Sequence, residues 1–360
     1  MSFLWDDNPL AGLPEITPYP GQSESSSSSA LSSLPASPIV QKTTTDVVND
    51  ILNDYQPIHA SDDTAKVLRA FVDNLSGQGL ATLQSEIYIF ATDPRQLRQL
   101  RNFLTDALLK PMAAAGGKQP PVTPSPNKSA AFEIELAMTQ IEGSSRTGQR
   151  SLKKECLSRD ANRCVISGLI DEEAFSSMSP EKRKGTSVTT ECAHILPFAL
   201  SNLDGRNATQ TKNRSTVWWA LYRYFPALKN KIGADTINQP GNAITLASAL
   251  HEQFGRFAFV FKATNEEHKY HMEILNDSSF YVVHMVPGSV VLPQEDAKVQ
   301  RPDSDILDVH MRIGRILQVS GISSAIYQSF VRGRSCIYNI ASDGSTDLER
   351  ILSDKMLMRI

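Results

Sequence analysis

Two histidines and an asparagine occupy positions in which they could hydrolyse a phosphodiester bond. His194 ends a short stretch with the pattern of a strand, Asn242 precedes a second such stretch, and His251 lies in the helix that should follow it. A histidine has an ordinary pKa of about 6.5, so His194 could act as a general base that takes a proton from water near neutral pH. An imidazole such as that of His251 could hold a divalent cation beside the phosphate.

Four sequence motifs surround these residues and should form the elements that position them. The first, residues 159–168, reads Arg-Asp-x-x-Arg-Cys-Val-Ile-Ser-Gly and should give an opening strand and a turn. Residues 190–198 and 240–246 should be the two site strands, and residues 248–254 should be the helix. In this order the motifs resemble those of the HNH endonuclease family, in particular the HNH domains common in uncharacterised fungal proteins.

The resemblance covers about residues 155–265 and implies an α+β fold with a ββα-metal core. It also implies a metal-dependent endonuclease that hydrolyses phosphodiester bonds in DNA with a histidine base and a single divalent cation. The residues that it marks as catalytic are His194, Asn242 and His251. The cation would be Mg²⁺, Mn²⁺, Ni²⁺ or Zn²⁺, and its identity is left open. A second hypothesis keeps the same scaffold without catalysis, as a module that binds nucleic acid or protein.

The metal ligands expected in this chain are His251, Asn242 and Glu191. Many HNH enzymes place an acidic residue or a histidine directly before the base, and here that position is Ala193. Strand alternation puts Glu191, two residues earlier, on the same face, so its carboxylate is the expected substitute. A further helix ligand of the family, four residues after the helix histidine, is replaced by Gly255.

Each of these residues also has a structural interpretation. His194 could be a buried histidine at the end of a strand, and His251 could be a half-exposed helix residue. Asn242 could bind metal through its side-chain oxygen, clamp the loop between the strands by hydrogen bonds to backbone groups, or simply occupy a Pro-Gly-Asn turn. The sequence leaves these alternatives open.

The segment between the two strands is rich in basic and aromatic side chains. Cations bind phosphates and aromatic rings stack on bases, so this segment is expected to hold DNA. Its candidate nucleic-acid ligands are Arg206, Lys212, Arg214 and Arg223. The alternative is a helix over 215–225 that buries the Trp and Tyr rings and leaves the basic residues on its outer face.

Composition and periodicity divide the chain into five regions. Low hydrophobicity and a serine run predict disorder at the start, and a Gly/Pro-rich stretch predicts a linker. The regions are a disordered tail at 1–40, a helical N-terminal region at 41–115, a linker at 116–129, the HNH nuclease-like domain at 130–285 with its core at 155–265, and a C-terminal helical extension at 286–360.

Several helices and strands can be placed within these regions. Apolar stripes predict a helix that begins after Asp62 and Asp63 and ends at Gly77, and a second that begins at Asp93-Pro94. Further helices are expected at 130–140 and after Pro302-Asp303-Ser304. Short apolar runs predict strands at 257–261, 270–275 and 280–285.

Composition restricts the class of protein and its compartment. The chain of 360 residues is 41% hydrophobic and 21% charged, with a net charge of −3, so any nucleic-acid binding must come from a local patch. No run of about 18 apolar residues and no signal-peptide pattern is present, which predicts an intracellular protein, cytoplasmic or nuclear. The four cysteines form no Cys-x-x-Cys pair and should be reduced thiols. Expected partners are DNA and proteins bound through the helical flanks, with no membrane and no small-molecule cofactor.

Overall fold

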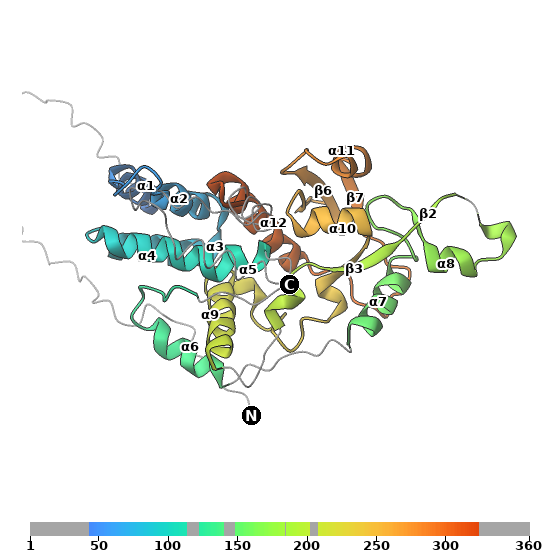
Figure 1. Ribbon diagram of the computed structural model, residues 1–360, viewed down its shortest axis with the longest axis horizontal. Helices are drawn as coiled ribbons and strands as arrows, with labels where there is room; N and C mark the ends of the chain where they lie inside the picture. The colour runs from blue at the N-terminus through green and yellow to red at the C-terminus, as the bar shows by residue number, and fades with distance from the viewer. Residues whose placement is uncertain (1–42, 114–121, 140–147, 184, 202–207, 324–360) are drawn as a thin grey trace, which may run out of the picture. The chain divides into compact units, whose positions relative to one another are not determined.

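The computed structural model describes residues 43–113, 122–139, 148–183, 185–201 and 208–323. The tail predicted at 1–40, residues 116–121 of the linker and residues 324–360 of the C-terminal extension lie outside the described residues. The described part of the chain belongs to one compact unit, residues 42–360. It combines helices with small sheets, which confirms the α+β class (Figure 1).

Helices form the N-terminal part of this unit, as the apolar periodicity predicts. They are α1 (Thr44–Asp54), α2 (Thr64–Asn74), α3 (Gly77–Phe90) and α4 (Pro94–Leu104), which continues through one π-helical turn (Thr105–Leu109) into α5 (Lys110–Ala113). Their buried faces carry the predicted apolar stripes, including Leu68, Phe71, Leu100 and Phe103.

Local chemistry explains where these helices begin. Thr43 and Asp46 form a capping box at α1, in which each side chain accepts a hydrogen bond from the backbone N–H of the other. Asp93 accepts from the Arg95 N–H at 2.9 Å and precedes Pro94, as predicted for α4. The predicted stop at Gly77 is wrong in detail, because α2 ends at Asn74 and Gly77 begins α3 with φ +53°, a conformation that favours glycine.

Two further helices cover this bundle. They are α6 (Ala130–Met138) and α9 (Ala208–Tyr224), and α9 packs against both α3 and α6. The described part of the expected linker, residues 122–129, is tied to the helices, since Thr123 donates to Asp106 and Asn127 donates to Glu86 at 3.2 Å. Residues 122–129 are therefore part of the packed unit.

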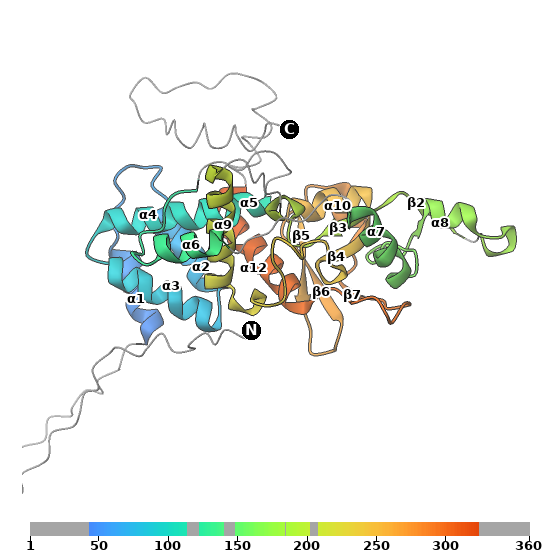
Figure 2. The same ribbon diagram turned by 90° about the horizontal axis from the view of Figure 1, so that it is seen from below.

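The sheet that carries the site residues has two strands. Strand β3 (Thr190–His194) pairs antiparallel with β4 (Ala243–Ala247), and α10 (Ser248–Gly255) follows β4 directly. Helix α7 (Gly148–Arg159) packs on the same two strands, and Figure 2 shows it beside them. The segment between α7 and β3 contains a short parallel pair of strands, β1 (Ile170–Asp171) and β2 (Ser187–Val188), and the helix α8 (Glu172–Ser177) that connects them.

A second sheet lies after the site. It is antiparallel and consists of β5 (Phe259–Ala263), β6 (Lys269–Ile274) and β7 (Ser289–Val291), so the first two predicted strands are confirmed. The strand predicted at 280–285 is wrong, because those residues form the helix α11 (Phe280–Met285). Val282 is buried and Met285 and Val286 pack against the core, which is the spacing of a helix face rather than the alternation of a strand.

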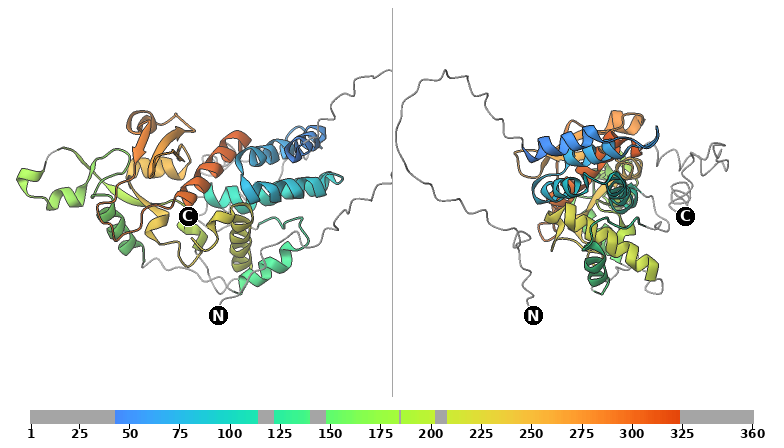
Figure 3. Two further views of the ribbon diagram at one scale, coloured as in Figure 1. Left: turned by 180° about the vertical axis from the view of Figure 1, so that it is seen from behind. Right: turned by 90° about the vertical axis from the view of Figure 1, so that its left-hand side faces the viewer.

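Helix α12 (Ser304–Ser320) joins the two parts of the unit. It begins as predicted, with Asp303 accepting from the N–H groups of Asp305 and Ile306, and it packs against both α2 and β5. Figure 3 shows it running between the N-terminal helices and the second sheet. None of the helices in the described ranges has the length and apolar character needed to cross a membrane.

Candidate functional site

The β3–β4 pair and α10 bring three of the predicted site residues to neighbouring positions. His194 ends β3 opposite Ala243, and Glu191 lies three residues earlier on the same strand. His251 lies in the first half of α10, which begins where β4 ends. Ala193 is fully buried and has no metal-binding atom in its side chain, so the position directly before the proposed base contributes packing only.

Glu191 and His251 contact each other directly. The His251 Nδ1 and a Glu191 carboxylate oxygen form a short hydrogen bond, and both side chains remain partly exposed, at 36% for His251 and 49% for Glu191. Partial burial alone would raise the pKa of Glu191, but the hydrogen bond and charge of His251, with help from Ser248 and Lys153, lower it. The carboxylate is therefore ionised at neutral pH beside an accessible imidazole.

His194 is more enclosed than His251, and one of its nitrogens is already bonded. Its Nε2 lies 2.9 Å from Asn238 Oδ1, and its ring packs near Phe198. An amide oxygen only accepts, so Nε2 carries the hydrogen and Nδ1 keeps its lone pair. Burial lowers the pKa of His194; the bond to Asn238 opposes this shift and the charge of His251 adds to it. The imidazole is thus neutral near pH 7 and has one basic nitrogen available.

Asn242 is fully buried and makes hydrogen bonds across the loop between the two strands. Its Oδ1 accepts from the Leu196 N–H at 2.8 Å, and its Nδ2 donates to the carbonyls of Leu196 and Ile237, each at 3.0 Å. Asn242 therefore clamps the loop between the two strands, which is one of the roles expected for it. The expected metal role of Asn242 does not fit this environment, because its side-chain oxygen is buried and bonded to the Leu196 N–H.

A buried ion pair between Arg159 and Asp160 forms hydrogen bonds with the backbone of β4. Arg159, at the end of α7, binds Asp160 through two hydrogen bonds and donates to the Ala243 carbonyl at 2.9 Å, while Asp160 accepts from the Thr245 N–H. The predicted opening strand at this motif is therefore a helix end, followed by a turn whose only described β-contact is the bridge between Arg163 and Ile170.

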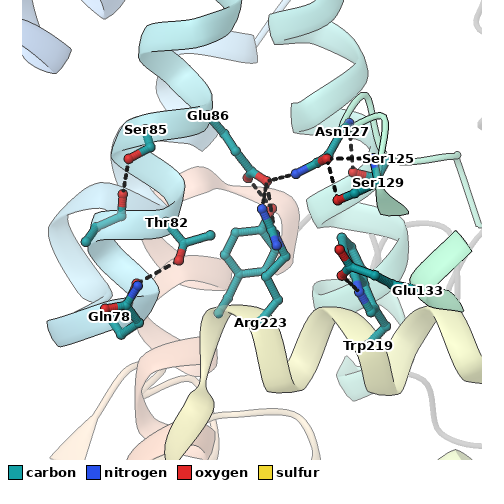
Figure 4. Close-up of polar contacts among 12 residues, drawn as sticks. Gln78, Thr82, Ser85, Glu86, Ser125, Asn127, Ser129, Glu133, Trp219 and Arg223 are labelled. Carbon is teal, nitrogen blue, oxygen red and sulfur yellow. Dashed lines mark hydrogen bonds and ion pairs between the residues drawn. The ribbon is translucent and has the colours of Figure 1, made fainter. Parts of the chain in front are cut away.

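The cations expected to hold DNA occupy other environments. Arg214 is buried, and burial lowers its pKa to about 10. Arg223 donates to the carboxylate of Glu86 at 2.7 Å and lies over the Trp219 ring (Figure 4). Lys212 is exposed on α9, and Arg206 lies outside the described residues. Arg214 and Arg223 thus belong to the packing of α9. The alternative interpretation is right that Trp218 and Trp219 are buried, but wrong to place all the basic residues on the outer face, because Arg214 is buried as well.

The donor set available to a divalent cation is small. Among the described residues, no group of three or more His, Cys, Asp and Glu side chains could hold a metal ion. The Glu191–His251 pair supplies one carboxylate and one imidazole, both of them ordinary ligands of divalent metals. Such a pair fits a cation whose other positions are filled by water and substrate oxygens.

Two residues near this site were missed by reasoning from the sequence. Asn238, which bonds the His194 ring, lies 44 residues further along the chain. Lys153 on α7 is near enough for its charge to lower the pKa of Glu191. The only sequence signal for Lys153 was its place in a basic stretch, Arg150 to Lys154, just before the likeness begins.

Comparison with protein families gives a match to the part of the chain that contains the site. Residues 164–262 match the family model described as HNH endonuclease, which spans β3, β4, α10 and most of β5 and excludes α7. No curated protein and no solved structure gives a significant match to the chain.

Proposed function

We propose that the protein is a metal-dependent endonuclease that hydrolyses phosphodiester bonds in DNA, because residues 164–262 match the HNH endonuclease family model. The proposal treats β3, β4 and α10 as a ββα-metal core. The observation that carries it is the convergence of Glu191 with His251 on the elements that also hold His194.

His194 is the general base. Its lowered pKa keeps the imidazole neutral near pH 7, and the bond from Nε2 to Asn238 leaves Nδ1 to accept a proton from the attacking water. Asn238 fixes the ring and its tautomer, as an outer partner commonly does for a functional histidine. Asn242 acts indirectly, because its bonds to Leu196 and Ile237 hold the loop that leaves the end of β3.

Glu191 and His251 are the residues that would hold the cation. A divalent cation bound there would neutralise charge on the scissile phosphate and on the leaving oxygen. The carboxylate is ionised and the imidazole is accessible, so both side chains can turn from each other towards a metal. With only two protein ligands, affinity for the cation should depend on the phosphate of the substrate.

A catalytically inactive HNH-fold module for nucleic-acid or protein binding is the second candidate. The buried Ala193, the buried Asn242 and the two-residue donor set favour it. Both candidates keep the same fold, so a cleavage experiment separates them.

The test is plasmid cleavage by the purified full chain with Mg²⁺, Mn²⁺, Ni²⁺ or Zn²⁺. Wild type should cut with at least one of them, and His194→Ala should lower turnover by roughly 10²–10⁴-fold, the usual contribution of a general base. His271→Ala is the matched control, because His271 is exposed on β6 and should leave turnover unchanged. Equal cleavage by wild type and His194→Ala with every cation would show that the activity is a contaminant. The second candidate, the inactive binding module, would then be the function that remains.

A further inference from the structure

Helix α7 has two chemically different faces. Leu152, Cys156 and Arg159 recur at helical spacing and are buried against the β3–β4 pair, where the Cys156 sulfur lies 3.6 Å from that of Cys192. Arg150, Lys153 and Lys154 also share one face, since residues three and four apart are neighbours on a helix. Arg150 and Lys154 are exposed, and Lys153 is half-buried at the edge nearer the strands.

The three cations on this face have no ion-pair partner among the residues that the structure describes. The single carboxylate of α7, Glu155, instead accepts a hydrogen bond from Ser151, one turn earlier. Arg223 differs in this respect, because Glu86 already binds its guanidinium.

This basic face lies next to the proposed active site. Helix α7 packs on both β3 and β4, and its Cys156 contacts Cys192, the residue that follows Glu191 on β3. The buried side of the helix is fixed to β4 by Arg159, which donates to the Ala243 carbonyl. A ligand bound along α7 would therefore be held in a defined position relative to Glu191.

The chemistry of the face selects its partner. Unpaired lysine and arginine side chains bind backbone phosphates, whereas single-stranded nucleic acid is usually held by rings that stack on unpaired bases. Helix α7 contains no aromatic residue. Arg150 and Lys154 are one helical turn apart, about 6 Å along the axis, so the three cations can contact neighbouring phosphates of a duplex.

We propose that Arg150, Lys153 and Lys154 form the surface on which this protein binds the phosphate backbone of duplex DNA. The inference rests on the proposed function, which names DNA as the substrate. It moves the DNA-binding surface from α9 to α7, a helix outside the matched segment 164–262.

The test compares two triple variants of the full chain with equal loss of charge. In the first, Arg150, Lys153 and Lys154 are each replaced by Gln, which is a good helix former. In the control, three exposed lysines on other elements, Lys66, Lys128 and Lys262, are replaced by Gln. Binding of a fluorescent duplex is measured by anisotropy in the presence of EDTA, so that no cleavage occurs, at salt concentrations from about 50 to 200 mM.

Wild type and the control variant should bind the duplex with the same salt dependence. Each phosphate contact contributes about 0.9 to the slope of log affinity against log salt, so the α7 variant should lose roughly 2–3 from that slope. Lys153→Arg with Lys154→Arg should retain the wild-type slope because the charges remain. Circular dichroism and thermal unfolding of the α7 variant should match wild type, since no buried contact of α7 is changed.

Three results would overturn the proposal. They are no binding of duplex by wild type, equal weakening in both triple variants, and binding of the matching single strand at least as tight as that of the duplex. Failure of the proposed function gives a different result. In that case wild type binds duplex in EDTA through α7, but it does not cleave the duplex with any of the four cations.

Discussion

The junction between α3 and α9 and the site on β3 and α10 both contain a glutamate bound to a basic side chain, but their surroundings differ. Glu86 is buried, and its carboxylate accepts from Arg223, from Asn127 and from the Tyr224 hydroxyl at 2.6 Å. Glu191 is half-exposed, and His251 is its closest partner.

The difference separates a structural ion pair, Glu86–Arg223, from the pair that we propose holds the cation, Glu191–His251. Each oxygen of Glu86 is held by at least one donor from another element, so nothing remains for a ligand. The Glu191 carboxylate and the His251 ring are partly exposed to solvent. Replacing their hydrogen bond by bonds to a cation should therefore cost little stability. Substitutions at the junction should therefore change stability, and substitutions at the site should change activity.

Arg223→Ala should give the largest loss of stability. It leaves the Glu86 carboxylate buried without its cation, and breaking a buried pair in this way costs about 3 kcal/mol. Urea unfolding followed by circular dichroism measures the change. Lys269→Ala is the control, because its ion pair with Glu266 is largely exposed and should contribute less than about 1 kcal/mol. If both variants lost the same free energy of unfolding, the Glu86–Arg223 pair would be no more important for stability than an exposed surface pair.

His310→Phe should reduce the loss of stability in acid. His310 is buried between the rings of Phe254 and Phe257, and burial lowers its pKa to about 3. Phe254 belongs to α10, the helix that carries His251. The unfolded chain binds the proton below its pKa of about 6.5 and the folded protein does not, so stability falls as the pH falls from about 6.5 to about 3. Between pH 7.5 and pH 5 this amounts to about 2 kcal/mol.

Urea unfolding of wild type and His310→Phe at these two pH values measures that contribution. The loss on acidification should be smaller in the variant by about this amount. A loss of the same size in both proteins would place the acid sensitivity at other groups.

Glu191→Gln should impair the cation site while leaving the fold intact. The cation concentration for half-maximal cleavage should rise by at least roughly tenfold, the lower end of the effect of losing even an outer partner of a metal ligand. The free energy of unfolding should change by less than about 1 kcal/mol, because the pair is half-exposed. A variant that unfolds as easily as Arg223→Ala would identify Glu191 as a structural residue.

Asn238→Asp should have the smallest effect, a displacement of the pH profile. A carboxylate in place of the amide oxygen favours the protonated form of His194, so the base stays inactive up to a higher pH. The acidic limb of cleavage, measured from about pH 5 to about pH 9, should move to higher pH than in wild type. An unmoved limb would mean that Asn238 does not act through the His194 ring.

The sequence predicted the parts of the fold that depend on neighbouring residues. Asp93-Pro94 and Asp303 mark the starts of α4 and α12, because a helix cap acts within one turn. The strand predicted at 280–285 is a helix, since a run with five hydrophobic residues out of six suits either a short strand or a short helix until its partners are known.

The site was predictable where strand alternation determines it and not where distant elements meet. Glu191 follows from alternation with Ala193. Asn238 does not, because it reaches His194 only after the loop between the strands has folded back. Arg214 is buried in the packed helices, and Arg223 is bound to Glu86, 137 residues earlier in the chain; no local pattern encodes either environment.

The junction also bears on how this protein can be shortened or grafted. At Gly79 the backbone of α3 comes so near α9 that a Cβ there would lie 2.0 Å from the Tyr224 carbonyl oxygen. A fragment cut at residues 164 and 262 would keep α9 but remove α3, uncovering Tyr224 and leaving Arg223 without its carboxylate. The evolutionary unit recognised by sequence is therefore smaller than the unit that folds, and a transplantable version of this domain should carry its N-terminal helices with it.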